Sequence, residues 1–123
     1  REDINPQMRY LQRSKGDSVL SEYEIIIEAK AKADMIQIFE YIDNTLLEHN
    51  TASKIYLSIY NAINSLNVFP QRCGVIKKEP WHTKGIRRLL SGNYSIFFVI
   101  HEETHRIHIF RVIYSRRSWE NII

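Results

Sequence analysis

Residues 85–119 read GIRRLLSGNYSIFFVIHEETHRIHIFRVIYSRRSW, and this stretch decides the fold. Residues 86–90, 94–101 and 106–114 are rich in Ile, Val, Phe and Tyr, which favour strands. The triplets Ser-Gly-Asn and Glu-Glu-Thr separate these segments and are typical of turns. Short turns join neighbouring antiparallel strands, so the stretch predicts a three-stranded antiparallel meander.

The middle strand of this meander is apolar on both faces. The even-numbered residues from Tyr94 to Ile100 share one face, and Phe97 and Val99 share the other. A strand of this kind is typical of the centre of a sheet. In the last strand, strict alternation places Arg111 on a mostly apolar face, where its charge needs a partner or an open cleft.

The upstream half of the chain changes from a strand pattern to a helix pattern at Ala29. Residues 22–28 contain three consecutive isoleucines and predict a strand. Apolar residues then recur at helical spacing, at Met35, Phe39, Ile42 and Leu46. This pattern predicts a first helix that ends near Glu48. A second helix is predicted from an N-cap at Thr51 to a stop at Pro70, with an apolar stripe at Ile55, Ile59, Ala62, Leu66 and Phe69.

These elements predict an α+β fold in the order β-α-α-β-β-β. The two helices form a hairpin packed on one face of a small, mainly antiparallel sheet, and the other face of the sheet is positive and partly concave. Residues 71–84 predict a loop at the border of the sheet. Trp81 in this loop either binds a partner or fills the edge of the core.

The composition indicates one small domain with an uneven charge distribution. The chain has 123 residues, of which 44% are apolar, and its net charge is +3. Residues 22–69 contain seven acidic and three basic residues, whereas residues 72–117 contain ten basic and three acidic residues. The basic half favours an anionic partner, or is an ordinary solvated surface. The single Cys73 and the lack of a membrane-length apolar run lead us to expect a cytoplasmic protein.

The sequence contains none of the common cofactor or hydrolase motifs. It has no Gly-rich phosphate loop, no Cys/His metal spacing and no Gly-x-Ser-x-Gly elbow. Three histidines, His101, His105 and His108, approach the same predicted hairpin turn, but no thiol and carboxylate set accompanies them. We therefore expect neither a cofactor nor a metal.

The order and spacing of these pieces resemble the RelE/ParE superfamily of toxins from bacterial type II toxin–antitoxin pairs. The resemblance rests on the hairpin with its Gly-Asn turn and Tyr94, and on a last strand that runs into R-V-x-Y-x-R-R-x-W-x-x-I from Arg111 to Ile122. It continues upstream through LNVFP at residues 66–70 to about Glu22. Residues 22–123 are therefore expected to form the toxin domain. Residues 1–21 are expected to be a flexible extension, a tag or a linked segment.

The resemblance implies two alternative activities. RelE-like members are metal-independent endoribonucleases, and Arg88 and Arg117 match their basic positions, with His108 and Tyr114 as further candidates. Ser95 stands where those enzymes carry an arginine, and the C-terminal residues 121–123 lack their Tyr or His. This departure favours the ParE-like branch, which is associated with inhibition of DNA gyrase. A third alternative is a degenerate toxin that only binds its antitoxin.

The ParE-like interpretation also implies a binding surface for gyrase or for an antitoxin. The arginine pair after the last strand matches that branch, although Ser118 stands where the branch often has an aspartate. We expect the surface to comprise Arg87, Arg88, Arg111, Tyr114, Arg116, Arg117 and Trp119. Trp119 alternatively packs the C-terminus onto the core.

Overall fold

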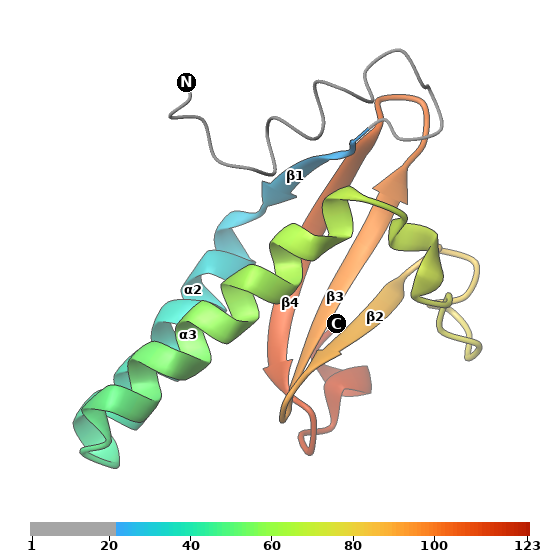
Figure 1. Ribbon diagram of the computed structural model, residues 1–123. Helices are drawn as coiled ribbons and strands as arrows, with labels where there is room; N and C mark the ends of the chain where they lie inside the picture. Colours follow the sequence, from blue (N-terminus) through green and yellow to red (C-terminus); the bar gives the residue numbers. More distant parts are fainter. Residues whose placement is uncertain (1–21) are drawn as a thin grey trace, which may run out of the picture.

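The computed structural model describes residues 22–123 (Figure 1), so the predicted extension at residues 1–21 lies outside the described residues. The domain contains two main helices and a four-stranded sheet: β1 (Glu24–Ile27), α2 (Ala29–Glu40), α3 (His49–Asn64), β2 (Arg87–Ser91), β3 (Tyr94–His101) and β4 (Arg106–Tyr114). The chain order β-α-α-β-β-β confirms the predicted α+β fold.

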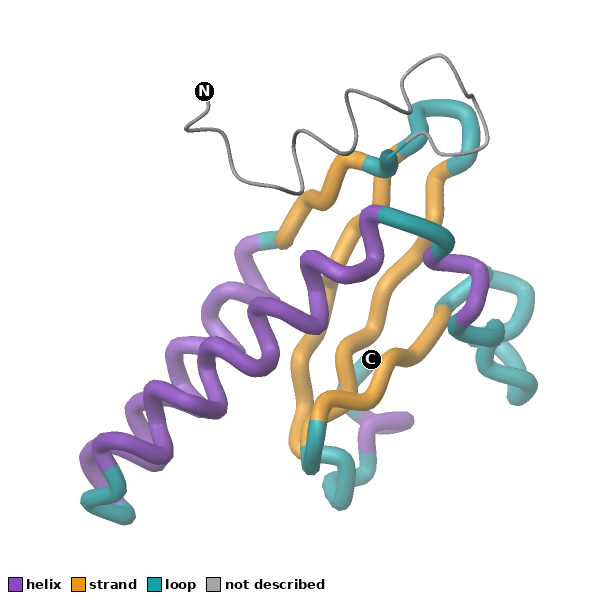
Figure 2. The backbone as a smooth tube through the Cα atoms, viewed as in Figure 1, coloured by secondary structure: helices purple, strands orange, loops and turns teal. Residues whose placement is uncertain are grey.

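The sheet has the strand order β1-β4-β3-β2 (Figure 2). Strands β2, β3 and β4 form the predicted antiparallel meander. Strand β1 adds to β4 in parallel, from the pair Glu24 and Arg106 to the pair Ile27 and Ile109. The middle strand of the meander, β3, is thus interior as predicted, and it shares the centre of the sheet with β4. Because β1 is short, the second half of β4 has no strand on its outer side.

The two helices form an antiparallel hairpin on one side of the sheet (Figure 1), but their predicted ends were wrong. Helix α2 gives way to a π-helical turn at Tyr41–Thr45. The N-cap position of α3 is Glu48 rather than Thr51. The α-helix stops at Asn64 and tightens into a 3-10 turn at Ser65–Asn67, and Val68 is already extended, so the helix ends well before Pro70. No helix within residues 22–123 is both long and apolar enough to cross a membrane.

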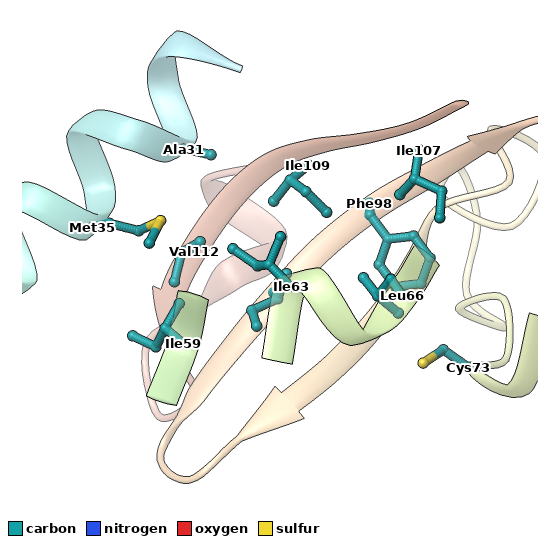
Figure 3. Close-up of a cluster of buried hydrophobic side chains, with 11 residues drawn as sticks. Ala31, Met35, Ile59, Ile63, Leu66, Cys73, Phe98, Ile107, Ile109 and Val112 are labelled. Carbon is teal, nitrogen blue, oxygen red and sulfur yellow. The ribbon is translucent and has the colours of Figure 1, made fainter. Parts of the chain in front are cut away.

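The main core lies between the hairpin and the sheet (Figure 3). Its buried members come from both helices and from the two interior strands, and include Ala31, Met35, Ile59, Ile63, Leu66, Phe98, Ile107, Ile109 and Val112. Burial of each large aliphatic or aromatic side chain contributes roughly 1.5–3 kcal/mol. Most residues of the predicted helical stripes are therefore core residues, but Leu46 and Phe69 are exposed and the partly buried Phe39 lines a hollow on the outer side of the hairpin.

A second apolar cluster occupies the opposite face of the sheet. Phe97 and Ile113 from the interior strands are buried there with Trp81 and Ile86. Side chains from the loop and from the C-terminal tail pack against this cluster, including Ile76, Trp119, Ile122 and Ile123. The expected open, positive face was thus wrong for the centre of the sheet. Trp81 fills the edge of the core, which decides between the two roles left open for it.

A bulge in β4 explains why the predicted alternation of this strand fails. Phe97 pairs with Arg111 whereas Phe98 pairs with Ile109, so Phe110 is an extra residue with no counterpart in β3. An extra residue in one strand shifts the side-chain alternation that follows it. Ile109 and Val112 therefore share the main core, and Phe110 belongs with the second cluster.

Candidate functional site

Arg111 lies beside α2, where its charge is paired. Its Nε donates to Asp34 Oδ2 at 2.7 Å and its Nη2 donates to Oδ1 at 2.9 Å, a bidentate arrangement. Asp34 Oδ2 also accepts the backbone N–H of Val112 at 2.9 Å, on the edge of β4 that β1 leaves unpaired. The hydrogen bonds to Asp34 raise the pKa of Arg111 above its ordinary value. Arg111 therefore stabilises the edge of the sheet. Because its charge is already paired with Asp34, it contributes little to the binding of a partner.

Arg88 lies on the face of the second cluster, where aromatic rings hold it. Its guanidinium carbon is 5.8 Å from the ring centre of Phe97 and 5.6 Å from that of Trp119. Its Nε donates to the Oγ of the fully buried Ser95 at 2.9 Å, and the Ser95 and Ser115 hydroxyls are 2.8 Å apart. These contacts fix the side chain through cation–π attraction and a hydrogen bond.

Arg87 points to the other face, as adjacent residues in a strand must. It pairs in register with Phe98 of the main core, and its Nη1 donates to the carbonyl oxygen of Cys73 at 2.6 Å. Arg87, Arg88 and Arg111 therefore occupy three separate environments. We expected either Arg87 or Arg88 to share a cationic sheet face with Arg111, and the structure brings neither of them to Arg111.

A groove of about 670 Å³ lies between the hairpin and the C-terminal end of β4. The hairpin contributes Ile38, Tyr41, Ile42, Leu46 and Ile55 to its lining, and the sheet contributes Tyr94, Val112, Ile113 and Tyr114. Arg117 also lines it and is exposed to solvent. The rings of Tyr94 and Tyr114 meet edge to face at 5.7 Å, and burial is the main cause that raises the pKa of Tyr94. The groove is thus largely apolar, and its polar lining residues are Asp34, Gln37, Glu48, Thr51 and Arg117.

The C-terminal tail after β4 places its remaining candidate residues in two settings. Arg116 is exposed, like Arg117. Trp119 turns back onto the second cluster, with ring centres 5.1 Å from Trp81 and 5.4 Å from Phe97. An exposed ion pair of 3.5 Å between Lys78 and Glu120 joins the tail to the loop. Trp119 therefore packs the C-terminus onto the sheet.

The histidines lie toward the other end of β4. His108 Nδ1 is 3.1 Å from Glu28 Oε2, and the His108 ring contacts that of His101 at 4.6 Å between centres. His108 lies two strands from Arg88 and two residues further along, which separates their Cα atoms by roughly 12 Å. Among residues 22–123, no three His, Cys, Asp or Glu side chains are grouped to hold a metal ion.

Sequence reasoning missed several residues of these sites. Asp34 falls within a helical pattern, and nothing local indicates that it reaches a residue 77 positions away. Ser115 lies between Tyr114 and the arginine pair in the sequence, and its contact with Ser95 was not predicted. The hairpin side of the groove was assigned to the core as a whole, because periodicity identifies an apolar face but does not show where the sheet stops covering it.

Comparison with models of protein families identifies the family of this domain. Residues 25–119 match the sequence model of the family described as ParE toxin of type II toxin-antitoxin system, parDE. The chain belongs to the ParE toxin family. It is thus a toxin of the type II toxin–antitoxin class within the RelE/ParE superfamily, as its strand and tail patterns predicted. Comparison with the curated proteins found no significant match.

Solved structures with the same fold include members of both branches. One is from the chromosomal ParDE system of P. aeruginosa, with a TM-score of 0.63 and 21% identity over 76% of this chain and 97% of that chain. Another is from the RelBE2 toxin–antitoxin complex of Mycobacterium tuberculosis, with a TM-score of 0.59 and 17% identity over 76% of this chain and 98% of that chain. At these identities the matches show a shared fold.

Proposed function

We propose that this ParE family member arrests bacterial growth by inhibiting DNA gyrase, and that a cognate antitoxin holds it inactive in the cytoplasm. The family match supports a toxin, and the exposed pair Arg116 and Arg117 supports the gyrase-directed branch. The apolar residues that cover the face of the sheet around Arg88 support gyrase, rather than RNA, as the target. Phe97 and Trp119 contact Arg88 and Ile122 packs against the same cluster, which would hinder an RNA strand from reaching this arginine.

Ribonuclease chemistry needs groups that converge on one phosphate. A base must deprotonate the 2′-hydroxyl, cations must stabilise the developing charge, and an acid must protonate the leaving oxygen. Arg88 is held by Ser95 and two aromatic rings, and His108 lies roughly 12 Å away beside Glu28. Loss of a single transition-state donor costs about 3 kcal/mol. The dispersal of these groups therefore disfavours endoribonuclease activity.

The groove between the hairpin and β4 suits the tail of an antitoxin. Its apolar walls would receive aliphatic side chains, while Arg117 would receive a carboxylate. A disordered acidic segment that folds on contact meets both requirements. Apolar contacts should supply most of the affinity, and the charges should mainly speed the encounter. We therefore expect added salt to weaken binding chiefly through a slower association rate.

Induced production of residues 21–123 without an antitoxin should arrest bacterial growth. The arrested cells should show a DNA damage response with intact mRNA, and the purified domain should inhibit gyrase supercoiling. Arg117→Ala should lower that inhibition at least tenfold, because it removes an exposed cation at the groove. Arg106→Ala is the matched control, since this exposed arginine lies at the other end of β4.

Two results would redirect this proposal. Codon-positioned mRNA cuts that vanish in the Arg117→Ala variant would replace gyrase by the ribosome as the target. Normal growth with abundant folded protein would instead favour a degenerate toxin that only binds its antitoxin.

We further propose that residues 22–123 form the complete antitoxin-binding domain and that residues 1–21 are a separate extension. The described residues include a four-stranded sheet, the helices α2 and α3 and the groove. Deletion of residues 1–20 should leave the affinity for the antitoxin encoded beside the toxin gene within about twofold, as measured by calorimetry. A tenfold or larger increase in affinity would mean that the extension competes for the antitoxin site.

A further inference from the structure

The outer face of the helical hairpin, turned away from the sheet, carries exposed apolar side chains. Ile36 on α2 is 50% exposed, and Leu57 and Tyr60 on α3 are 58% and 42% exposed. Ile36 and Leu57 line the same hollow of about 550 Å³, together with Phe39 and Tyr56 and with the polar residues Glu40, Asp43, Asn44 and Ser53. Exposed apolar side chains gathered around one hollow on a small domain mark an interaction site more often than isolated exposed residues do. None of the residues that line this hollow lines the groove beside β4.

Two charges on this face lie at equal distances on either side of Ile36, and Asp43 adds a second acidic group at the end that carries Glu40. Lys32, Ile36 and Glu40 are spaced four residues apart along α2, so they follow one line on the helix surface. The lysine and the glutamate each lie about 6 Å from Ile36 along the helix axis. Within residues 22–123, neither forms an ion pair. One end of the line is thus positive, the other is negative and the centre is apolar.

We propose that this outer face binds the same face of a second copy of the chain about a two-fold axis. A two-fold interface brings each surface patch against itself. If the two α2 helices run antiparallel and meet at Ile36, Lys32 of each copy lies opposite Glu40 of the other. A parallel arrangement would instead oppose like charges. The charge pattern therefore selects one dimer geometry, while Ile36, Leu57 and Tyr60 supply its apolar centre.

The size of the face indicates a reversible dimer. Helix α2 is about 18 Å long, and two packed helices are together about 20 Å wide. Each copy therefore offers roughly 400 Å², or about 800 Å² in total, which is below the ~1,200 Å² of a stable complex. A weak and reversible association is therefore expected. The groove and Arg117 stay accessible in this dimer, so it is independent of the proposed toxin target.

Sedimentation velocity of the full chain, made by cell-free synthesis, tests the dimer between about 1 μM and 1 mM. The sedimentation coefficient should rise with concentration toward that of a dimer. Leu57→Arg should raise the dissociation constant at least tenfold. Leu90→Arg is the matched control, because Leu90 is a 60% exposed leucine on β2, outside this face, and its replacement should change nothing.

Charge reversal tests the antiparallel geometry itself. Lys32→Glu should weaken the dimer at least threefold, because two glutamates then face each other at each end of the interface. Adding Glu40→Lys to the same chain should restore wild-type association, since both pairs are then reversed. Circular dichroism checks that each variant is folded. A monomer throughout the concentration range, an equal loss in Leu90→Arg, or no recovery in the double variant would each overturn the proposal.

Discussion

Replacement of Arg111 by methionine is expected to lower the free energy of unfolding by about 3 kcal/mol. The side chains of Arg111 and Asp34 are only 14% and 10% exposed, so the variant leaves a carboxylate that is nearly buried and has lost its cation. Removal of one partner of a buried pair typically costs about 3–5 kcal/mol, and the remaining bond from the Val112 N–H places this case at the lower end. Urea unfolding at neutral pH, followed by circular dichroism, measures the loss.

A second arginine in the same strand provides the control for this prediction. Arg106 pairs with Glu24 at 2.9 Å, but the two side chains are 49% and 61% exposed. Water screens such a pair, so Arg106→Met should cost less than about 1 kcal/mol. The double variant Asp34→Asn with Arg111→Met should recover part of the loss, because it removes the unpaired charge. Equal unfolding midpoints for Arg111→Met and wild type would show that the pair does not stabilise the fold.

Replacement of Trp119 by alanine should cost about 2–3 kcal/mol of stability. The indole contacts the rings of Trp81 and Phe97 and the guanidinium of Arg88, and all three contacts disappear together. Full truncation of a buried Trp costs about 3–5 kcal/mol, and Trp119 is only partly buried. Thermal and urea unfolding would measure the change. Trp fluorescence should also report a more polar surrounding for Trp81, which loses its neighbour.

Tyr114→Ala is the matched control for the tail. Tyr114 precedes the same tail, but it is exposed and its ring meets that of Tyr94 rather than the second cluster. Its replacement should cost less than about 1 kcal/mol. If Trp119→Ala proved as mild as Tyr114→Ala, the tail would not be a fixed part of the second cluster. The tail would then not keep RNA from Arg88 either.

Local patterns in the sequence predicted most of the fold. The bounds of β3 and β4 followed from their apolar content and from the turns beside them, because turn chemistry acts over a few residues. The start of α3 was less predictable. Thr51 has a good capping side chain, but the chain leaves the π-helical turn through Leu47 in a left-handed conformation and begins the helix at once. Tertiary context thus overrode the local capping preference.

The candidate site was much harder to predict, because it depends on contacts between distant residues. The pattern around Arg111 indicated correctly that it needs a partner, but Asp34 could have been any acidic residue of the first helix. The bulge at Phe110 changes the face of every later residue in β4, and no local composition marks it. The second cluster joins a loop, two strands and the tail. Its existence was therefore not evident from any single segment.

The parallel pairing of β1 with β4 has a consequence for the order in which the domain is made. Glu24 and Arg106 are 82 residues apart, so the first strand of the domain meets its neighbour only when the last strand exists. Contacts between such distant segments slow folding, because a long loop must close first. A ribosome releases β1 and the hairpin well before β4. The finished sheet is therefore a property of the completed chain, and a product that ends before residue 106 lacks the strand that joins its two halves.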